Sequence, residues 1–356
     1  MARLQSLATL TSRIYRFRHA NPEGIEAFQQ RHPETHDESL DECRRCPTQV
    51  VAIADHLIRH NHPNTDEPRL QPRPTNPNGE VHIIQWNSID EEALGLSDFV
   101  SSLITVGRYS PGDFLILTPR RLLGYRIRDL LKASNVPVHS FYHEEALEGL
   151  DQGTLSLPNV ADLITKFREL LGILANLKDR ELTGIVDALM PANNDECSVL
   201  REAAILALPD VQGVADLFEA LKTHVTQPEM PEQGNFVRVM SLHKSKGLTS
   251  KVAIIAGCIH GLIPFVDPDE PPKEQAAILA EQRRLFYVAI TRCTDVLVLS
   301  SVIRMERKLA WKIGAQLKPG QSSVGATIAS RFIHELGPSA PLPLSGQQWK
   351  ACKYML

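Results

Sequence analysis

Two short segments of the sequence carry residue types that could bind phosphate. The first covers residues 241–248, reads Ser-Leu-His-Lys-Ser-Lys-Gly-Leu, and lies between two apolar stretches that predict strands. A glycine in such a turn lets backbone N–H groups approach a phosphate or a sugar closely, and the lysines and the histidine add charge and donors. Taken alone, the segment is equally consistent with an ordinary basic turn between two strands.

The second segment, residues 281–293, reads as the end of a helix that leads into another predicted strand. Arg292 lies at this helix-to-strand turn, at one edge of the expected sheet. An arginine there could point at a neighbouring domain and stabilise the charge on a phosphoryl group during transfer. The simpler alternative is a solvated cation that the C-terminal end of the helix dipole favours.

Together, the two segments resemble motifs V and VI of the UvrD/Rep-type superfamily 1 DNA helicases. The family pattern is roughly T-x-H-x-x-K-G-L-E, an apolar strand, and a helix that ends in R-R-L-x-Y-V-A-x-T-R. Both the order and the spacing agree between Ser241 and Arg292, and residues 261–264 resemble the Gly-x-x-Pro element of the family.

Three further segments resemble parts of the same family. Residues 14–20 are similar to motif III, whose aromatic residues stack on the bases of single-stranded DNA. Residues 43–46 read Cys-Arg-Arg-Cys where the family has N-Y-R-S, and residues 330–336 are similar to its S-R-F-x-x-E-L stretch. The resemblance therefore touches residues 12 to about 336, weakly across 145–234. An unrelated α/β enzyme would need all these ordered motifs by coincidence.

The resemblance implies roles for particular residues at a nucleotide. These helicases close two RecA-like domains around ATP and Mg²⁺, and the second domain supplies arginines that reach the γ-phosphate. By position, Arg45 and Arg292 match those arginines. Arg44 replaces the tyrosine that stacks on adenine, Gly247 matches the backbone that turns beside the ribose, and Thr249 replaces the acid that binds the ribose.

The resemblance also implies contacts with single-stranded DNA, which is the expected macromolecular partner. Stacking of bases on aromatic side chains tolerates any base sequence. The residues that match positions near the strand are Tyr15, Phe17, Arg18, Ser241 and His243.

The sequence departs from the family where the phosphates should be cradled. It contains no G-x-x-x-x-G-K-[ST] and no carboxylate cluster like D-E-x-Q-D after a strand, so the P-loop and the Mg²⁺ ligand are missing. ATP and Mg²⁺ are therefore expected only in a completed helicase, with a second chain that carries the Walker A and Walker B motifs. Alone, this chain is expected to be inactive as an ATP hydrolase.

Hydrophobic periodicity predicts the elements that must position these residues. Strands alternate with helices before residue 142 and again after residue 235, which implies a parallel sheet with right-handed crossovers. The predicted strands cover 81–86, 114–118, 136–141, 236–242, 252–257 and 296–302, and the predicted helices cover 90–105, 122–134 and 273–290. The expected fold class is therefore α/β with an all-helical insertion, and the family resemblance implies that the sheet belongs to a RecA-like domain of the P-loop-NTPase type.

The domain organisation follows from the same pattern. Residues 48–60 place apolar side chains at helical spacing, and the stretch after them contains five prolines, which favours an extended linker. The predicted parts are a remnant of the first RecA-like domain with a helical segment (1–62), a linker (63–79), the second RecA-like domain (80–144 and 235–303), a helical insert (145–234), and a basic helix from Arg304 with a tail (304–356).

Composition excludes several classes of protein. The chain has 356 residues and a net charge of −4, which argues against a histone-like polycation but not against a local patch that binds nucleic acid. No apolar run is long enough to span a bilayer, no secretion signal is evident, and a cytoplasmic location with no membrane partner is expected. Among six scattered cysteines, the C-x-x-C of Cys43 and Cys46 could be half a zinc site or a redox pair. Because no second pair matches it, no metal site is expected.

Three functional hypotheses remain open from the sequence. The chain is the C-terminal part of an ATP-dependent helicase that moves along and unwinds DNA from three-prime to five-prime, as the family does, if another chain supplies the P-loop. Alternatively, it is a non-catalytic module derived from a helicase that binds DNA or protein. A truncated remnant without an independent role is the third hypothesis.

Overall fold

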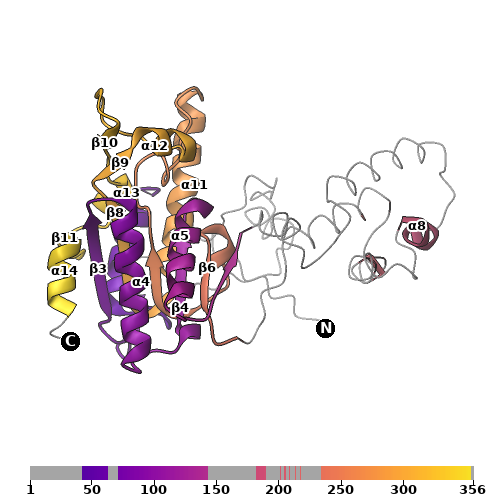
Figure 1. Cartoon of the computed structure of the whole chain (residues 1–356), viewed down its shortest axis with the longest axis horizontal. Coiled ribbons are helices and arrows are strands. Elements are labelled where there is room, and N and C mark those ends of the chain that lie inside the picture. The colour runs from indigo at the N-terminus through magenta and orange to yellow at the C-terminus, as the bar shows by residue number, and fades with distance from the viewer. Residues whose placement is uncertain are drawn as a thin grey trace, which may run out of the picture. The chain divides into compact units, whose positions relative to one another are not determined.

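The computed structural model describes residues 42–62, 71–142, 182–189 and 234–353, with a few single positions between 201 and 217. The chain divides into two compact units, Phe141–Gln233 and the remainder. The larger unit contains a seven-stranded sheet with helices packed against it (Figure 1). Helix α8 (Leu182–Leu189) is the one element longer than two residues among the described residues of the smaller unit.

The sheet confirms the predicted α/β class. Its strand order is β11-β3-β8-β7-β4-β6-β5, and the pairings from β11 through to β6 are all parallel. Strand β4 lies between β6 and β7 and is buried at all of its positions, which explains its uninterrupted apolar sequence. The strands are β3 (Glu80–Trp86), β4 (Phe114–Thr118), β5 (Val138–Phe141), β6 (Val237–Ser241), β7 (Ser250–Ile255), β8 (Cys293–Val302) and β11 (Leu344–Ser345).

The helices predicted at 48–60, 90–105, 122–134 and 273–290 are also confirmed, within one residue at each end. Helix α4 (Ile89–Thr105) is capped at its N-terminus by Ser88, whose hydroxyl accepts a hydrogen bond from the Glu91 amide at 3.2 Å. Helix α4 lies beside α5 (Arg121–Ala133) (Figure 1). Helix α3 (Thr48–Arg59) buries its apolar stripe and packs against α11 (Pro272–Ile290). This contact attaches the segment before the linker to the helix that leads into Arg292.

The C-terminal segment differs from the prediction. Arg304 does not begin a helix, because Arg304–Glu306 forms strand β9, which pairs antiparallel with β10 (Val324–Ala326). Helix α12 covers only Arg307–Ile313 and ends at Gly314, in the left-handed region with φ of 82°. Near the C-terminus, β11 pairs with β3 at the edge of the sheet. Helix α14 (Gly346–Lys353) follows it, and the ring centroids of Trp349 and Phe99 lie 4.7 Å apart.

Short elements complete the described chain. They are β1 (Glu42–Cys43), β2 (Gln71–Pro72), η3 (Pro111–Asp113), η6 (His243–Ser245) and α13 (Arg331–His334). The predicted remnant at residues 1–41, residues 63–70 of the linker and most of the helical insert lie outside the described residues, so these assignments stay predictions. Within the described part of the chain, no helix combines the length and apolar character that a membrane span requires.

A buried ion pair connects α11 to the segment after β10. Arg283 donates to both carboxylate oxygens of Glu335, at 2.7 and 3.0 Å, and to the side-chain oxygen of Asn61. Arg331 donates to the same carboxylate at 2.9 Å. Burial is the largest single effect and opposes ionisation of Glu335, but the hydrogen bonds and charges of Arg283 and Arg331 together outweigh it and lower the pKa of Glu335. The S-R-F-x-x-E-L stretch therefore helps to hold α11.

A second buried carboxylate lies at the carboxyl ends of the central strands. Glu92 of α4 is 2% exposed, and its Oε1 accepts from the Ser300 hydroxyl at 2.6 Å and from the Gly257 amide at 3.1 Å. The Ser300 hydroxyl in turn accepts from the indole N–H of Trp86 at 3.0 Å. Burial raises the pKa of Glu92, because it disfavours the ionised form.

Replacing Glu335 by alanine is expected to lower the free energy of unfolding by about 3–5 kcal/mol, because Arg283 is left buried without its counter-ion. Urea denaturation measures this loss. The double variant Glu335→Ala with Arg283→Met removes both charges and should recover part of it. A single variant as stable as the wild type would contradict the assignment of this pair as structural.

The pH dependence of stability tests Glu92. Its folded-state pKa is raised, so its contribution to stability is fully present below the unfolded pKa and is lost as the pH rises through the folded pKa. Glu92→Gln keeps the acceptor oxygen without the charge. We expect this variant to gain thermal stability relative to the wild type as the pH is raised from about 5 to about 8. The exposed Glu274→Gln variant is the control and should show no such trend; a flat difference for Glu92→Gln would refute the prediction.

Candidate functional site

The Arg292 side chain joins the end of helix α11 to the loop before β7. Its Nε donates to the Val288 carbonyl at 2.7 Å, and its Nη1 donates to the Leu248 carbonyl at 3.1 Å. The Arg292 carbonyl accepts from the Ser250 amide at 2.9 Å. These contacts bring together the two segments whose residue types could bind phosphate. The residue is 7% exposed and is therefore not the solvated cation of the simpler alternative.

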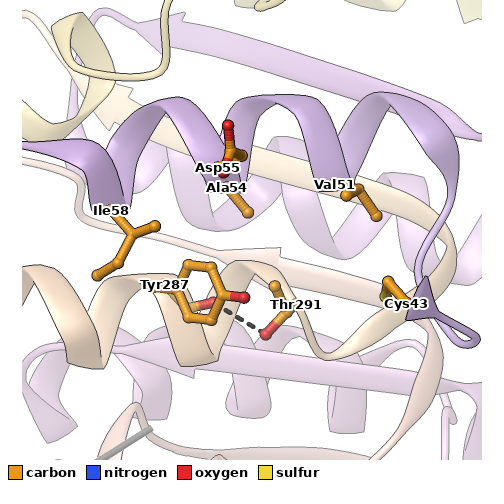
Figure 2. Close-up of a pocket in the computed structure, with 7 residues that line it drawn as sticks. All are labelled: Cys43, Val51, Ala54, Asp55, Ile58, Tyr287 and Thr291. Carbon is orange, nitrogen blue, oxygen red and sulfur yellow. Dashed lines mark hydrogen bonds between the residues drawn. The ribbon is translucent and has the colours of Figure 1, made fainter. Parts of the chain in front are cut away.

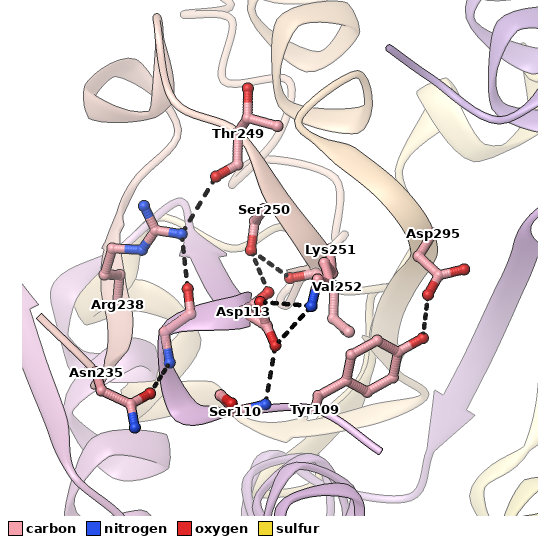
Figure 3. A network of polar contacts seen from close by, with 11 residues as sticks. Tyr109, Ser110, Asp113, Asn235, Arg238, Thr249, Ser250, Lys251, Val252 and Asp295 are labelled. Atoms are coloured by element: carbon pink, nitrogen blue, oxygen red, sulfur yellow. Dashed lines mark hydrogen bonds and ion pairs between the residues drawn. The ribbon is translucent and has the colours of Figure 1, made fainter. Parts of the chain in front are cut away.

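A second arginine holds the same loop from the other side. Arg238 of β6 donates through Nη2 to the Thr249 carbonyl at 3.3 Å and to the Gly112 carbonyl at 3.2 Å (Figure 3). The carbonyls of Leu248 and Thr249 thus each accept from a different guanidinium. Arg238 was not identified from the sequence, because nothing in a strand residue at this position signals that it reaches the next loop.

The loop between these arginines presents backbone to open space. Gly247 has a φ of 89°, which L side chains rarely adopt, and no atom lies within 4 Å of the position that a Cβ would take. The Thr249 side chain is exposed. A ligand could therefore approach the main chain at Gly247 without displacing any described side chain.

Arg45 lies close enough to Arg292 for their charges to interact. It follows β1 in the Cys-Arg-Arg-Cys turn, and the next residue, Cys46, donates its thiol to the Thr291 carbonyl at 3.4 Å. Burial lowers the pKa of Arg292 to about 10, and the positive charge of Arg45 adds to this effect. The structure thus brings together the two arginines that the family resemblance assigned to the γ-phosphate.

The electrostatics of this arrangement favour an anion. Among the described residues, neither Arg45 nor Arg292 forms an ion pair with a carboxylate, and Arg45 Nε is buried without a hydrogen-bond partner. A phosphate group beside the two guanidiniums would supply acceptors and oppose their mutual repulsion. The residues present therefore fit an anionic group such as a phosphate.

Asn76 holds the turn that carries Arg45. Its side-chain amide donates to the Cys43 carbonyl at 2.6 Å and to the Cys46 carbonyl at 2.9 Å. This residue comes from the end of the proline-rich linker and was not identified from the sequence. The only indication in the sequence was that the residues around Asn76 are of types that favour turns.

The other predicted site residues are distributed differently. Arg44 is exposed on the same turn as Arg45. Ser241 and His243 are partly buried at the carboxyl end of β6, whereas Arg292 lies at the amino end of the parallel β8. The residues matched to DNA and to nucleotide therefore lie toward opposite ends of the strands. Tyr15, Phe17 and Arg18 are outside the described residues. Within the described ranges, no three potential metal-ligating side chains gather.

Comparisons with known proteins agree with the motif assignment. The family described as UvrD-like helicase C-terminal domain matches residues 142–304. The chain is 29% identical over 241 residues to the ATP-dependent DNA helicase UvrD1 of Mycobacterium tuberculosis, covering 54% of this chain and 30% of that protein. It is 25% identical to the putative ATP-dependent DNA helicase YjcD of Bacillus subtilis, covering 83% of this chain and 48% of that protein.

A third relative is the ATP-dependent DNA helicase PcrA of Staphylococcus aureus, which is 28% identical over 42% of this chain and 20% of that protein. The matched region spans less than half the length of each of these three relatives. The chain therefore matches the C-terminal half of a UvrD/Rep-type superfamily 1 helicase, which confirms the family resemblance.

Gly247→Ala is expected to lower the free energy of unfolding by about 1–2 kcal/mol, because the residue must keep a left-handed backbone. Gly107→Ala is a matched control, since Gly107 has a φ of 75° and also has open space within 4 Å of the position that a Cβ would take. Chemical denaturation should show that the two alanine variants lose a similar amount of unfolding free energy. Gly247→Asn should lose less, because asparagine tolerates this region better. Equal losses for alanine and asparagine would argue against backbone strain.

Proposed function

We propose that this chain provides the second RecA-like domain of an ATP-dependent superfamily 1 DNA helicase. In this proposal, Arg45 and Arg292 contact the γ-phosphate of an ATP that a P-loop outside the present sequence holds. The observation that carries it is the convergence of these two arginines, from distant parts of the chain, beside the Gly247 loop. The helicase would move along single-stranded DNA from three-prime to five-prime.

The proposed chemistry of this half is electrostatic. ATP with Mg²⁺ would supply the phosphoryl group and its activation, and the P-loop and carboxylates that hold them are absent from this sequence. Arg45 and Arg292 would stabilise charge that develops on the transferred group, an effect worth roughly 10³–10⁵ in rate. Arg44 would lie against the base, and the backbone at Gly247, with Thr249, would lie beside the ribose. The existing bonds from Arg292 to Val288 and Leu248 support this role, because they pre-orient its guanidinium.

The proposed DNA contacts use the other end of the sheet. Ser241 and His243 lie at the carboxyl end of β6 and would contact single-stranded DNA. Tyr15, Phe17 and Arg18 would stack on or pair with the same strand. Stacking at such positions contributes roughly 1–3 kcal/mol per base without sequence preference.

A non-catalytic module that binds DNA is the second candidate, and it is favoured by Arg44 in place of the family's adenine-stacking tyrosine and Thr249 in place of its ribose-binding acid. The two candidate functions share the DNA contacts but differ in whether Arg45 and Arg292 contact ATP. An ATPase measurement with a supplied P-loop domain therefore separates them.

The test combines this chain with a Walker A and Walker B RecA-like domain from a relative such as YjcD. We expect single-stranded DNA to stimulate ATP hydrolysis by the mixture, and Arg292→Gln or Arg45→Gln to reduce it by roughly 10³-fold or more. Arg304→Gln, an exposed arginine of β9, is the control and should retain the rate. Thermal denaturation checks that each variant folds.

The same samples test the alternative. Fluorescence anisotropy with a single-stranded oligonucleotide should show binding that weakens as salt rises, because phosphate contacts release counter-ions. Salt-dependent binding without stimulated hydrolysis would favour the non-catalytic module. Hydrolysis that survives Arg292→Gln and Arg45→Gln would contradict the role assigned to the arginine pair.

A further inference from the structure

The two cysteines of the Cys-Arg-Arg-Cys turn are held close together. The backbone carbonyls of Cys43 and Cys46 accept hydrogen bonds from the same nitrogen of Asn76, at 2.6 and 2.9 Å. Parallel pairing of Cys43 with Pro72 fixes the first end of the turn, and burial of Cys46 fixes the second. Both side chains lie beside Thr291, because the Cys46 thiol donates to its carbonyl and Cys43 lines the pocket that includes it. The pair is therefore arranged before any reaction takes place.

The two thiols differ in accessibility. Cys43 is partly exposed and lines a pocket between α3 and α11, which also includes Tyr287 and Thr291 (Figure 2). Cys46 is 1% exposed and donates to the Thr291 carbonyl. An incoming reagent can thus reach the Cys43 thiol first, whereas the Cys46 thiol is buried.

The surroundings of the two cysteines also give their thiols different pKa values. The proximity of Cys46 lowers the pKa of Cys43 to about 5 against the effect of burial, and the Arg45 cation contributes in the same direction. The proximity of Cys43 and burial together raise the pKa of Cys46. Because Cys43 is the accessible thiol and the thiolate is the reactive form, we assign Cys43 as the nucleophile and the buried Cys46 as the resolving thiol.

We propose that Cys43 and Cys46 form a thiol–disulfide exchange site that small disulfides of the glutathione class oxidise. The Cys43 thiolate attacks one sulfur of the small disulfide, forms a mixed disulfide and releases one small thiolate. Cys46 then loses its proton to solvent and attacks the Cys43 sulfur. This step forms the Cys43–Cys46 disulfide and releases the second small thiolate, so the protein dithiol is oxidised and the small disulfide is reduced.

Oxidation would act directly on Arg45. Arg44 and Arg45 are the two residues enclosed by the new bond, and Cys46 would give up its hydrogen bond to Thr291, next to Arg292. The thiol pair would thereby control the position of Arg45 relative to Arg292. Its consequence for nucleotide contact rests on the proposed function, whereas the exchange reaction does not.

The experiment treats the full chain with oxidised glutathione, in a Cys197→Ser, Cys352→Ser background that removes the two cysteines other than Cys43, Cys46, Cys258 and Cys293. Intact mass should fall by two hydrogens, and peptide mapping should locate the disulfide at Cys43–Cys46. Cys46→Ser should accumulate one glutathione on Cys43. Cys43→Ser should remain unmodified at Cys46, which is buried. Absence of the disulfide, or equal glutathionylation of the two single variants, would overturn the proposal.

A second measurement tests the coupling to Arg45 without any nucleotide or partner chain. Amide hydrogen exchange should differ between the reduced and oxidised chain in peptides that contain Arg45 and Thr291, and should be unchanged in β4. Reduction with dithiothreitol should restore the first pattern. A disulfide that forms without any change around Arg45 would refute the coupling. Because neither readout involves ATP, failure here is distinguishable from failure of the helicase proposal.

Discussion

The position of the Arg292 guanidinium is the constraint on which the candidate site depends. It is nearly buried, yet it meets only backbone carbonyls and a hydroxyl, and among the described residues no carboxylate pairs with it. These carbonyls come from the end of its own helix and from the loop before β7, so one cation orients both segments. Taking it out of water lowers the pKa of Arg292, which shows that the charge is held at an energetic cost.

That cost explains the surroundings of the site. The Cys-Arg-Arg-Cys turn docks on Thr291 and adds the charge of Arg45, which increases the electrostatic repulsion. The segments that carry the two arginines are held by other contacts, because the Arg283–Glu335 pair holds α11 and Asn76 holds the turn. Binding of an anion would oppose the repulsion between the two arginines, as the proposed contact with a nucleotide phosphate requires.

The sheet and most helices were predictable because their signals are local. The unbroken apolar sequence of β4 reflects burial on both faces, and the apolar stripe in α3 reflects burial of one face against α11, β2 and β3. The prediction was wrong at Arg304, where a basic run suggested a helix. Pairing of β9 with β10 determines that segment, and a contact between strands that are distant along the chain leaves no periodic signal in either.

The sequence by itself determined the order of the motifs and the α/β class, because residue types and spacings along the chain carry that information. Only the tertiary structure decided which of these residues meet. Asn76 closing the turn of Cys43, Arg238 holding the carbonyl of Thr249, and Cys46 docking on Thr291 are contacts between distant segments. Such contacts depend on packing of the folded chain, so a single sequence contains no pattern that predicts them.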